Sequence, residues 1–132
     1  MVEVYIDGAS AGNPGPSGAG IFIKRENGEV NRHTIPLGTM SNHEAEYYAL
    51  LHALDICIHE GITTVSFRTD SQLIDAAIEK RYVKNQTYKP LLDEALAKIE
   101  QLELFFMKWV PSKQNRADEL SKRAIQLNQT TE

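Results

Sequence analysis

Residues 7–20 read D-G-A-S-A-G-N-P-G-P-S-G-A-G, a glycine-rich segment that begins with an aspartate. Before it, Val2, Val4 and Ile6 share one side of an alternating pattern, which predicts a short strand with one buried face. Asp7 therefore follows a buried strand, beside a backbone whose glycines allow another molecule to come close. Such a loop suits a sugar-phosphate chain, although Asp-Gly is also a common turn pair that needs no chemistry.

Length and composition fit one globular domain over residues 1–132, since 42% of the 132 residues are hydrophobic. The chain lacks any apolar run near the roughly 20 residues that span a bilayer, so we expect a cytoplasmic protein without membrane contact. We also expect a monomer. The single Cys57 lies among apolar residues, which predicts a buried thiol and excludes an internal disulfide.

The net charge of −4 argues mildly against nucleic acid as a partner. Lysines and arginines nevertheless gather in residues 80–89 and 108–123. Ordinary solvated surface charge would explain either group. Metal ions bound to carboxylates would also offset part of the negative charge locally.

Hydrophobic periodicity and turn signals predict an α/β fold. Asn27-Gly28 favours a two-residue hairpin, so three antiparallel strands come first and a β-α-β-α order follows. We expect a five-stranded mixed sheet with helices on both faces. The predicted strands cover residues 2–6, 19–24, 30–36, 62–68 and 102–110, and the predicted helices cover residues 41–60, 71–80, 89–101 and 115–127.

Three segments carry further expectations about position. Pro36 places the strand at 30–36 on an edge of the sheet. The strand at 102–110 is apolar on both faces, which favours a place inside the sheet. Leu127 should lie on the apolar stripe of the last helix, and residues 128–132 should form a frayed polar tail.

Two glutamates near the start of the first helix have different explanations. Ser41 and Glu44 fit a capping box, in which the two side chains satisfy each other's backbone amides. Glu46 instead lies on the stripe with Ala49 and Leu50, where a carboxylate is costly unless something compensates its charge. Attraction to the helix dipole is the alternative explanation for Glu46.

Two aspartates occupy comparable positions later in the chain. Asp70 follows a predicted strand at the point where catalytic groups of parallel sheets commonly lie, although it would also serve as an N-cap. Asp118 borders the apolar stripe of the last helix. With Lys122 four residues later, it could equally be one half of a surface ion pair.

Five segments together resemble type 1 ribonuclease H over essentially the whole chain. Residues 7–18 are similar to D-G-S-x-x-G-N-P-G-P-x-G with Ala9 in place of serine, and residues 41–47 to T-N-N-x-x-E-Y/L. Residues 69–72 match T-D-S-Q, residues 83–85 match V-K-N, and residues 115–121 resemble N-x-x-A/C-D-E-L-A. The resemblance implies that the catalytic and metal-binding residues are Asp7, Glu46, Asp70 and Asp118.

Clustered carboxylates would repel one another unless they surround hard cations, and ligand sets made only of oxygen point to Mg²⁺ or Mn²⁺. Two ions about 4 Å apart can activate a water and stabilise the departing 3′ oxygen of a phosphodiester. By resemblance, Asp7 would bridge both ions, Glu46 and Asp118 would each complete one site, and Asp70 would serve the water-activating ion.

The resemblance implies an RNA/DNA hybrid as the substrate, recognised partly through the 2′-OH of RNA. His43 replaces the family's second asparagine, Asn85 matches a residue that helps hold a DNA phosphate, and Lys113 could partly replace a missing histidine. The candidate substrate-binding residues are Gly8, Ala9, Gly12, Asn13, Asn42, His43, Gln72, Asn85 and Lys113.

The expected activity is cleavage of the RNA strand of hybrids, giving 5′-phosphate and 3′-OH ends. The chain departs from the family in two ways. A missing basic helix-and-loop predicts weaker binding of the hybrid by that region, and a short histidine-free stretch between Val110 and Asp118 predicts slow turnover and a preference for Mn²⁺. These departures leave open an alternative, a catalytically weak protein that binds hybrids. A flavodoxin-like enzyme acting on a small molecule is a third possibility, but the sequence lacks a phosphate-binding fingerprint.

Overall fold

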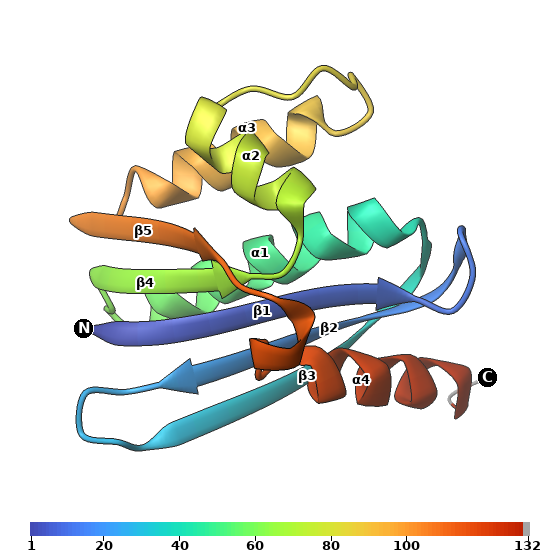
Figure 1. The fold of residues 1–132 in the computed structure, drawn as a ribbon, viewed down its shortest axis with the longest axis horizontal. Helices are drawn as coiled ribbons and strands as arrows, with labels where there is room; N and C mark the ends of the chain where they lie inside the picture. Colours follow the sequence, from blue (N-terminus) through green and yellow to red (C-terminus); the bar gives the residue numbers. More distant parts are fainter. Residues whose placement is uncertain (131–132) are drawn as a thin grey trace.

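The computed structural model describes residues 1–130 and contains the predicted five-stranded mixed sheet, with strand order β3-β2-β1-β4-β5 (Figure 1). β1 pairs antiparallel with β2, and β2 with β3, while β4 runs parallel to both β1 and β5. The strands are β1 (Val2–Ser10), β2 (Gly15–Lys24), β3 (Val30–Met40), β4 (Thr64–Thr69) and β5 (Leu104–Trp109).

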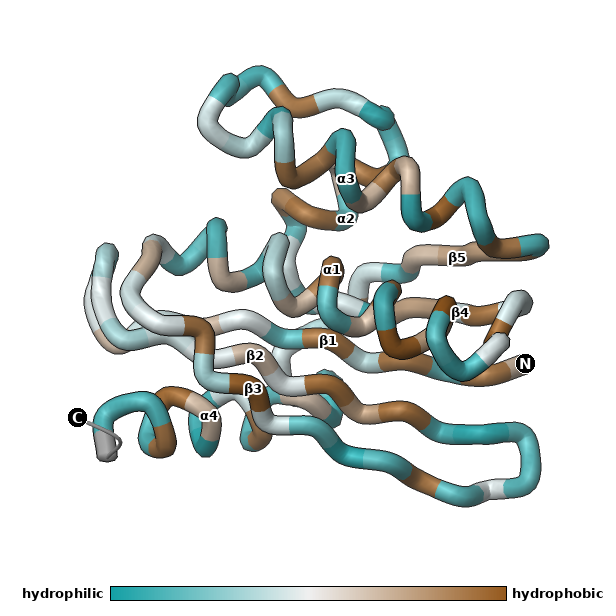
Figure 2. The backbone as a smooth tube through the Cα atoms, turned by 180° about the vertical axis from the view of Figure 1, so that it is seen from behind, coloured by the Kyte–Doolittle hydropathy of each residue, from teal (hydrophilic) through white to brown (hydrophobic). Residues whose placement is uncertain are grey.

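Helices cover both faces of the sheet, as predicted, with α1, α2 and α3 on one face and α4 on the other (Figure 1). The main core lies between the sheet and α1 to α3, and a smaller cluster around Phe22 and Ala117 lies under α4. Hydrophobic segments concentrate in the central strands and the helices that cover them, whereas the β2–β3 turn is hydrophilic (Figure 2). The helices are α1 (Asn42–His59), α2 (Gln72–Lys80), α3 (Lys89–Ile99) and α4 (Asp118–Thr130), with a short 3₁₀ turn, η1 (Ser112–Gln114).

The start of α1 confirms the predicted capping box. The Ser41 hydroxyl accepts the amide of Glu44 at 3.2 Å, and the Glu44 carboxylate accepts the amide of Ser41 at 3.0 Å. The helix ends at a cap on Glu60, followed by Gly61 with φ +73°. Because Glu44 is engaged in capping, Glu46 is the acid of this turn that remains for other chemistry.

The glycine-rich segment is more regular than the predicted loop. β1 continues through Ser10 and β2 already begins at Gly15, so only residues 11–14 form the turn. Small side chains permit this close antiparallel pairing, and the Ala11 amide donates to the Pro16 carbonyl at 2.8 Å across the hairpin. Asp7 therefore lies within β1, paired with Gly20, rather than after the end of a strand.

The two edges of the sheet correct one prediction and confirm another. β3 lies on one edge, as Pro36 predicts, and β5 lies on the opposite edge, although an interior position was predicted for it. Leu104 and Phe106 are consequently 44% and 49% exposed. The prediction was wrong because apolar side chains show only that a strand can be buried, and they do not show which strands pair with it. Within residues 1–130, no strand pairs with the outer side of β5.

The end of the chain also departs from prediction. α4 continues through Thr130, and the Asn128 side-chain amide donates to the carbonyls of Ser17 and Gly38 at 3.0 and 2.8 Å. The predicted frayed tail is thus wrong for residues 128–130, while residues 131–132 lie outside the described part. Leu127 is 42% exposed rather than buried, since the last turns of α4 extend to the margin of the sheet.

None of the helices within residues 1–130 combines the length and the apolar character that crossing a membrane requires.

Candidate active site

Three of the four predicted acids converge at one place in the fold. Asp7 lies on β1, Asp70 directly follows β4, and Asp118 is the first residue of α4. Each contributes a carboxylate oxygen to a set whose members all lie within 4.8 Å of one another. Residues far apart in the sequence therefore meet because β1 and β4 are parallel neighbours and α4 begins beside them.

Glycine allows two helices to come close to Asp7. A Cβ atom on Gly8 would lie 2.1 Å from the carbonyl oxygen of Ala45, so only glycine lets β1 contact the first turn of α1. On β2, a Cβ atom on Gly20 would lie 2.5 Å from the Ala117 carbonyl oxygen. Since Gly20 is the cross-strand partner of Asp7, this second contact places the start of α4 against the acid.

Asp7 has the most perturbed carboxyl group of the site. Its pKa is raised to about 8, above all by burial and also by the nearby charges of Asp70, Asp118 and Glu46. A hydrogen bond donated by the Ser121 hydroxyl to Asp7 Oδ2 at 2.5 Å acts in the opposite direction. Within residues 1–130, no lysine or arginine forms an ion pair with Asp7, so its negative charge lacks a direct counter-ion.

Glu46 lies beside these three acids rather than within their set. Its Oε2 accepts a hydrogen bond from the Ser71 hydroxyl at 2.7 Å and lies 3.4 Å from His43 Nδ1. Burial raises the pKa of Glu46, and the hydrogen bonds from Ser71 and His43 partly offset that effect. The acid is held near enough for its charge to raise the pKa of Asp7.

The structural alternatives for Asp70 and Asp118 have different outcomes. Ser71, not Asp70, is the N-cap of α2, because its hydroxyl accepts the amide of Ile74 at 3.1 Å. The Asp70 carboxylate is therefore not used for capping. Asp118 does form the predicted ion pair with Lys122, at 2.9 Å. Because the Lys122 side chain is exposed to solvent, this ion pair contributes little to stability.

Polar residues that sequence reasoning passed over hold the acids in place. The buried Asn115 side chain donates to the Ile6 carbonyl at 2.9 Å and accepts the Ala117 amide at 3.0 Å, so it ties the start of α4 to β1 next to Asp7. Ser121 could have been found from the sequence, because it stands where the N-x-x-A/C-D-E-L-A pattern ends in alanine. A hydroxyl at that position can donate a hydrogen bond to an acid.

Several predicted substrate-binding residues lie together at the β1–β2 turn and the start of α1. Asn13 Oδ1 accepts the Asn42 amide at 3.0 Å, and Asn42 Oδ1 accepts the Ser10 amide at 3.3 Å. These bonds fix the turn that contains Gly12 to the helix that carries His43. Of the other predicted residues, Gly8 and Ala9 lie on β1, and Gln72 is the exposed first residue of α2.

The structure does not bring Asn85 and Lys113 to the acids. Asn85 Oδ1 accepts the Thr87 amide at 2.9 Å in the irregular segment before α3. That segment reaches the start of α1 through Tyr88, whose ring stacks on Tyr47 with centroids 5.5 Å apart. Lys113 is an exposed residue of η1. Across the described residues, neither side chain contacts a carboxylate of the cluster.

The chemistry of the cluster suggests a divalent metal site. Its donors are carboxylate oxygens, which hard cations such as Mg²⁺ and Mn²⁺ prefer. Like-charged, half-buried groups within 4.8 Å of one another need a positive charge between them to ionise together. The residues present therefore fit such an ion.

A mixed sheet of this strand order, with a carboxylate cluster where β1, β4 and α4 meet, defines a ribonuclease H-like domain. A protein-family profile described as Reverse transcriptase-like matches residues 5–124. The Enterococcus faecalis protein named "Putative hydrolase EbsB" is 39% identical over 96% of the chain and 95% of its own length. Ribonuclease HI of Halobacterium salinarum is 33% identical over 94% of the chain, which spans 64% of that protein.

Solved structures agree with this assignment. The N-terminal ribonuclease H domain from Mycobacterium tuberculosis superposes with a TM-score of 0.90 at 30% identity, over 98% of the chain and 96% of that domain. LC11-RNase H1 in complex with RNA/DNA hybrid gives a TM-score of 0.87 at 31% identity, over 96% and 98% of the two chains. The chain belongs to the ribonuclease H-like family.

Proposed function

We propose that the protein is an endoribonuclease that cuts the RNA strand of RNA/DNA hybrids and leaves 5′-phosphate and 3′-OH ends. The observation that carries the proposal is the set of three carboxylates, drawn from β1, β4 and α4, whose oxygens lie within 4.8 Å of one another. Relatives named ribonuclease H, and a similar structure that contains an RNA/DNA hybrid, support the substrate class.

The residues that would hold metal are Asp7, Asp70 and Asp118, with Glu46 beside them. We propose two Mg²⁺ or Mn²⁺ ions in the active complex. When bound, such ions supply Lewis-acid stabilisation of an attacking water and of the departing oxygen. The short, histidine-free connection between β5 and α4 supports a preference for Mn²⁺.

The chain's own residues prepare this site. Ser121 and Ser71 donate to Asp7 and Glu46, which orients one oxygen of each carboxylate and leaves the remaining lone pairs for other ligands. Asp7 must lose its proton before it can act as a ligand, since burial raises its pKa to about 8. Metal loading is therefore coupled to proton release at neutral pH.

Recognition of RNA would come from the β1–β2 turn and the starts of α1 and α2. Asn13 and Asn42 fix the β1–β2 turn to the start of α1, and Gln72 is exposed two residues after Asp70 in the chain. Amide groups of this kind can bond the 2′-OH that distinguishes RNA from DNA. His43 adds a ring nitrogen at the same place, 3.4 Å from Glu46.

The second candidate is a hybrid-binding protein of little or no activity. It is favoured by the position of Lys113, the suggested substitute for the family's histidine, which is exposed on η1 and contacts no carboxylate of the cluster within residues 1–130. An end-labelled RNA/DNA hybrid, incubated with Mn²⁺ or Mg²⁺, separates the two. Cleavage by the wild type that is lost in Asp70→Asn, and kept in the matched surface variant Asp93→Asn, supports the nuclease. Binding without cleavage by all three proteins would overturn it.

A further inference from the structure

The outer strand β5 exposes an unusual share of the large hydrophobic side chains. Within the described residues, six large hydrophobic residues are exposed, and Leu104, Phe106 and Trp109 of β5 are three of them, at 44%, 49% and 40%. Strands at sheet edges are usually protected by charge, proline or a covering segment, because a free edge can pair with another chain. Lys108 is the one charged residue of β5.

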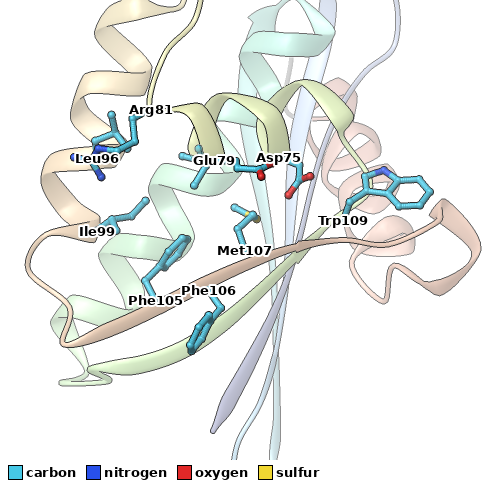
Figure 3. Close-up of a pocket in the computed structure, with 10 residues that line it drawn as sticks. Asp75, Glu79, Arg81, Leu96, Ile99, Phe105, Phe106, Met107 and Trp109 are labelled. Atoms are coloured by element: carbon cyan, nitrogen blue, oxygen red, sulfur yellow. The ribbon is translucent and has the colours of Figure 1, made fainter.

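A groove of about 520 Å³ runs along the same strand, between β5, α2 and the end of α3. Phe105 and Met107 of β5 form one wall, and Leu96 and Ile99 of α3 contribute apolar side chains opposite (Figure 3). It is distinct from the acid cluster, because none of Asp7, Glu46, Asp70 and Asp118 lines it.

The backbone of β5 offers hydrogen bonds at this edge. The amides of Leu104 and Val110 donate toward the β4 side, at 3.1 and 2.8 Å. Because successive residues of a strand direct their amides and carbonyls to opposite sides, those of Phe105 and Met107 point to the outer edge. The same two residues direct their side chains into the groove, so one edge combines a hydrogen-bonding ladder with an apolar surface.

The polar part of the groove is acidic. Asp75 and Glu79 lie on the α2 wall above β5 (Figure 3), and burial followed by the charge of Glu79 raises the pKa of Asp75. In the described part of the chain, neither acid forms an ion pair. Arg81, the cation that lines the groove, is paired with Glu100 at 3.0 Å. The unpaired acids of the groove therefore favour a positively charged group on a ligand, and they would repel phosphate groups.

We propose that β5 and its groove bind an extended segment of a partner protein, which adds to the sheet as a sixth strand. Peptides recognise sheet edges in this way through main-chain hydrogen bonds, and side-chain pockets give specificity. An apolar side chain of the partner fills the groove over Phe105 and Met107. A lysine or arginine two residues away, on the same face of the segment, reaches Asp75 and Glu79.

The chain carries its own reporter for this surface. Trp109 is the single tryptophan, it lines the groove, and it is 40% exposed. A strand laid along β5 covers this indole, so binding shifts the fluorescence to shorter wavelength. Trp109 Nε1 also donates to the backbone carbonyl of Asp70 at 3.1 Å, which places the groove next to the acid cluster.

The test is a fluorescence titration of the full chain with capped seven-residue peptides. The first alternates valine and threonine with one lysine on the valine face, the second has glutamate in place of that lysine, and the third is the lysine peptide N-methylated at alternate amides. We expect the lysine peptide to bind at least tenfold more tightly than the other two. The double variant Asp75→Asn with Glu79→Gln should remove the preference for lysine over glutamate.

Three results would overturn the proposal. They are an unchanged tryptophan spectrum up to about 1 mM lysine peptide, equal binding of the lysine and glutamate peptides, and binding that survives N-methylation. Light scattering tests the other occupant, a second copy of the chain. If the protein forms a dimer that Phe106→Lys dissociates, the edge is a self-association surface and the proposed partner is wrong. Circular dichroism confirms that each variant remains folded.

Discussion

Replacing Asp7 with asparagine should stabilise the metal-free protein at neutral and alkaline pH. The folded protein holds this carboxyl where burial raises its pKa from 3.8 to about 8. Because folding raises the pKa of Asp7, its protonated form contributes to the stability of the folded protein. This contribution is fully present below about pH 4 and is lost as pH rises through about 8. The asparagine side chain would keep an oxygen for the Ser121 hydroxyl and would never ionise, so the variant lacks this loss.

The size of the effect follows from the displacement of the pKa. Each tenfold change in proton binding corresponds to about 1.4 kcal/mol. Between pH 5 and pH 8, the folded carboxyl approaches half-titration while its unfolded counterpart is already ionised. The wild type should therefore lose on the order of 3 kcal/mol relative to Asp7→Asn, which corresponds to about 10 °C in Tm for a chain of this length.

The assay is thermal unfolding in EDTA at pH 5, 6, 7 and 8, for the wild type, Asp7→Asn and the exposed control Asp93→Asn. Titrating groups away from the cluster act equally in the three proteins, so the difference between wild type and Asp7→Asn reports Asp7 together with the acids coupled to it. Added Mn²⁺ should raise the Tm of the wild type and not that of Asp7→Asn. Parallel pH profiles for these two proteins would refute the reasoning.

Three further outcomes are expected. Gly8→Ala should lower the free energy of unfolding in urea by about 1–3 kcal/mol, because its Cβ would lie 2.1 Å from the Ala45 carbonyl oxygen; unchanged stability would mean that α1 can move away freely. Ser71→Ala should cost about 1–2 kcal/mol and reduce hybrid cleavage, since the hydroxyl caps α2 and donates to Glu46; Ser71→Thr should restore both. Cys57, whose thiol pKa burial raises to about 12, should react with iodoacetamide only as fast as the protein unfolds.

Patterns that depend on neighbours in the sequence predicted most of the fold. The alternation of Val2, Val4 and Ile6 and the capping box at Ser41 specify local geometry, and the structure confirms both. The predicted two-residue hairpin at Asn27-Gly28 is wrong: Arg25 and Glu29 close a turn with three residues between them, and only Gly28 of the pair has a positive φ. The position of β5 could not be obtained in this way. Its apolar faces indicate that it can be covered, whereas its place in the sheet depends on which strands pair with it.

The same limit explains what was found and missed at the site. The resemblance to the ribonuclease H motifs, rather than position alone, selected the three aspartates that converge, and Asp7 lies within β1 instead of at the predicted strand end. The sequence could not decide whether Asp70 or Ser71 is the N-cap of α2, since aspartate and serine are both good capping residues. Asn115 and Ser121 act across the fold, on Ile6 and Asp7, and the motif that contains them does not show which residues more than 100 positions away they contact.

The groups that hold the acids explain why the site can remain ready for a cation. Asp7 and Glu46 are oriented by the hydroxyls of Ser121 and Ser71, which supply hydrogen bonds but no positive charge. An arginine at either place would lower the pKa of the acid and stabilise the metal-free fold, and it would also compete with a bound ion for the same oxygens. Neutral donors fix the geometry and leave the negative charge uncompensated. The pKa of Asp7 is thus raised by burial above all, and no lysine or arginine within residues 1–130 pairs with the acid to offset that effect.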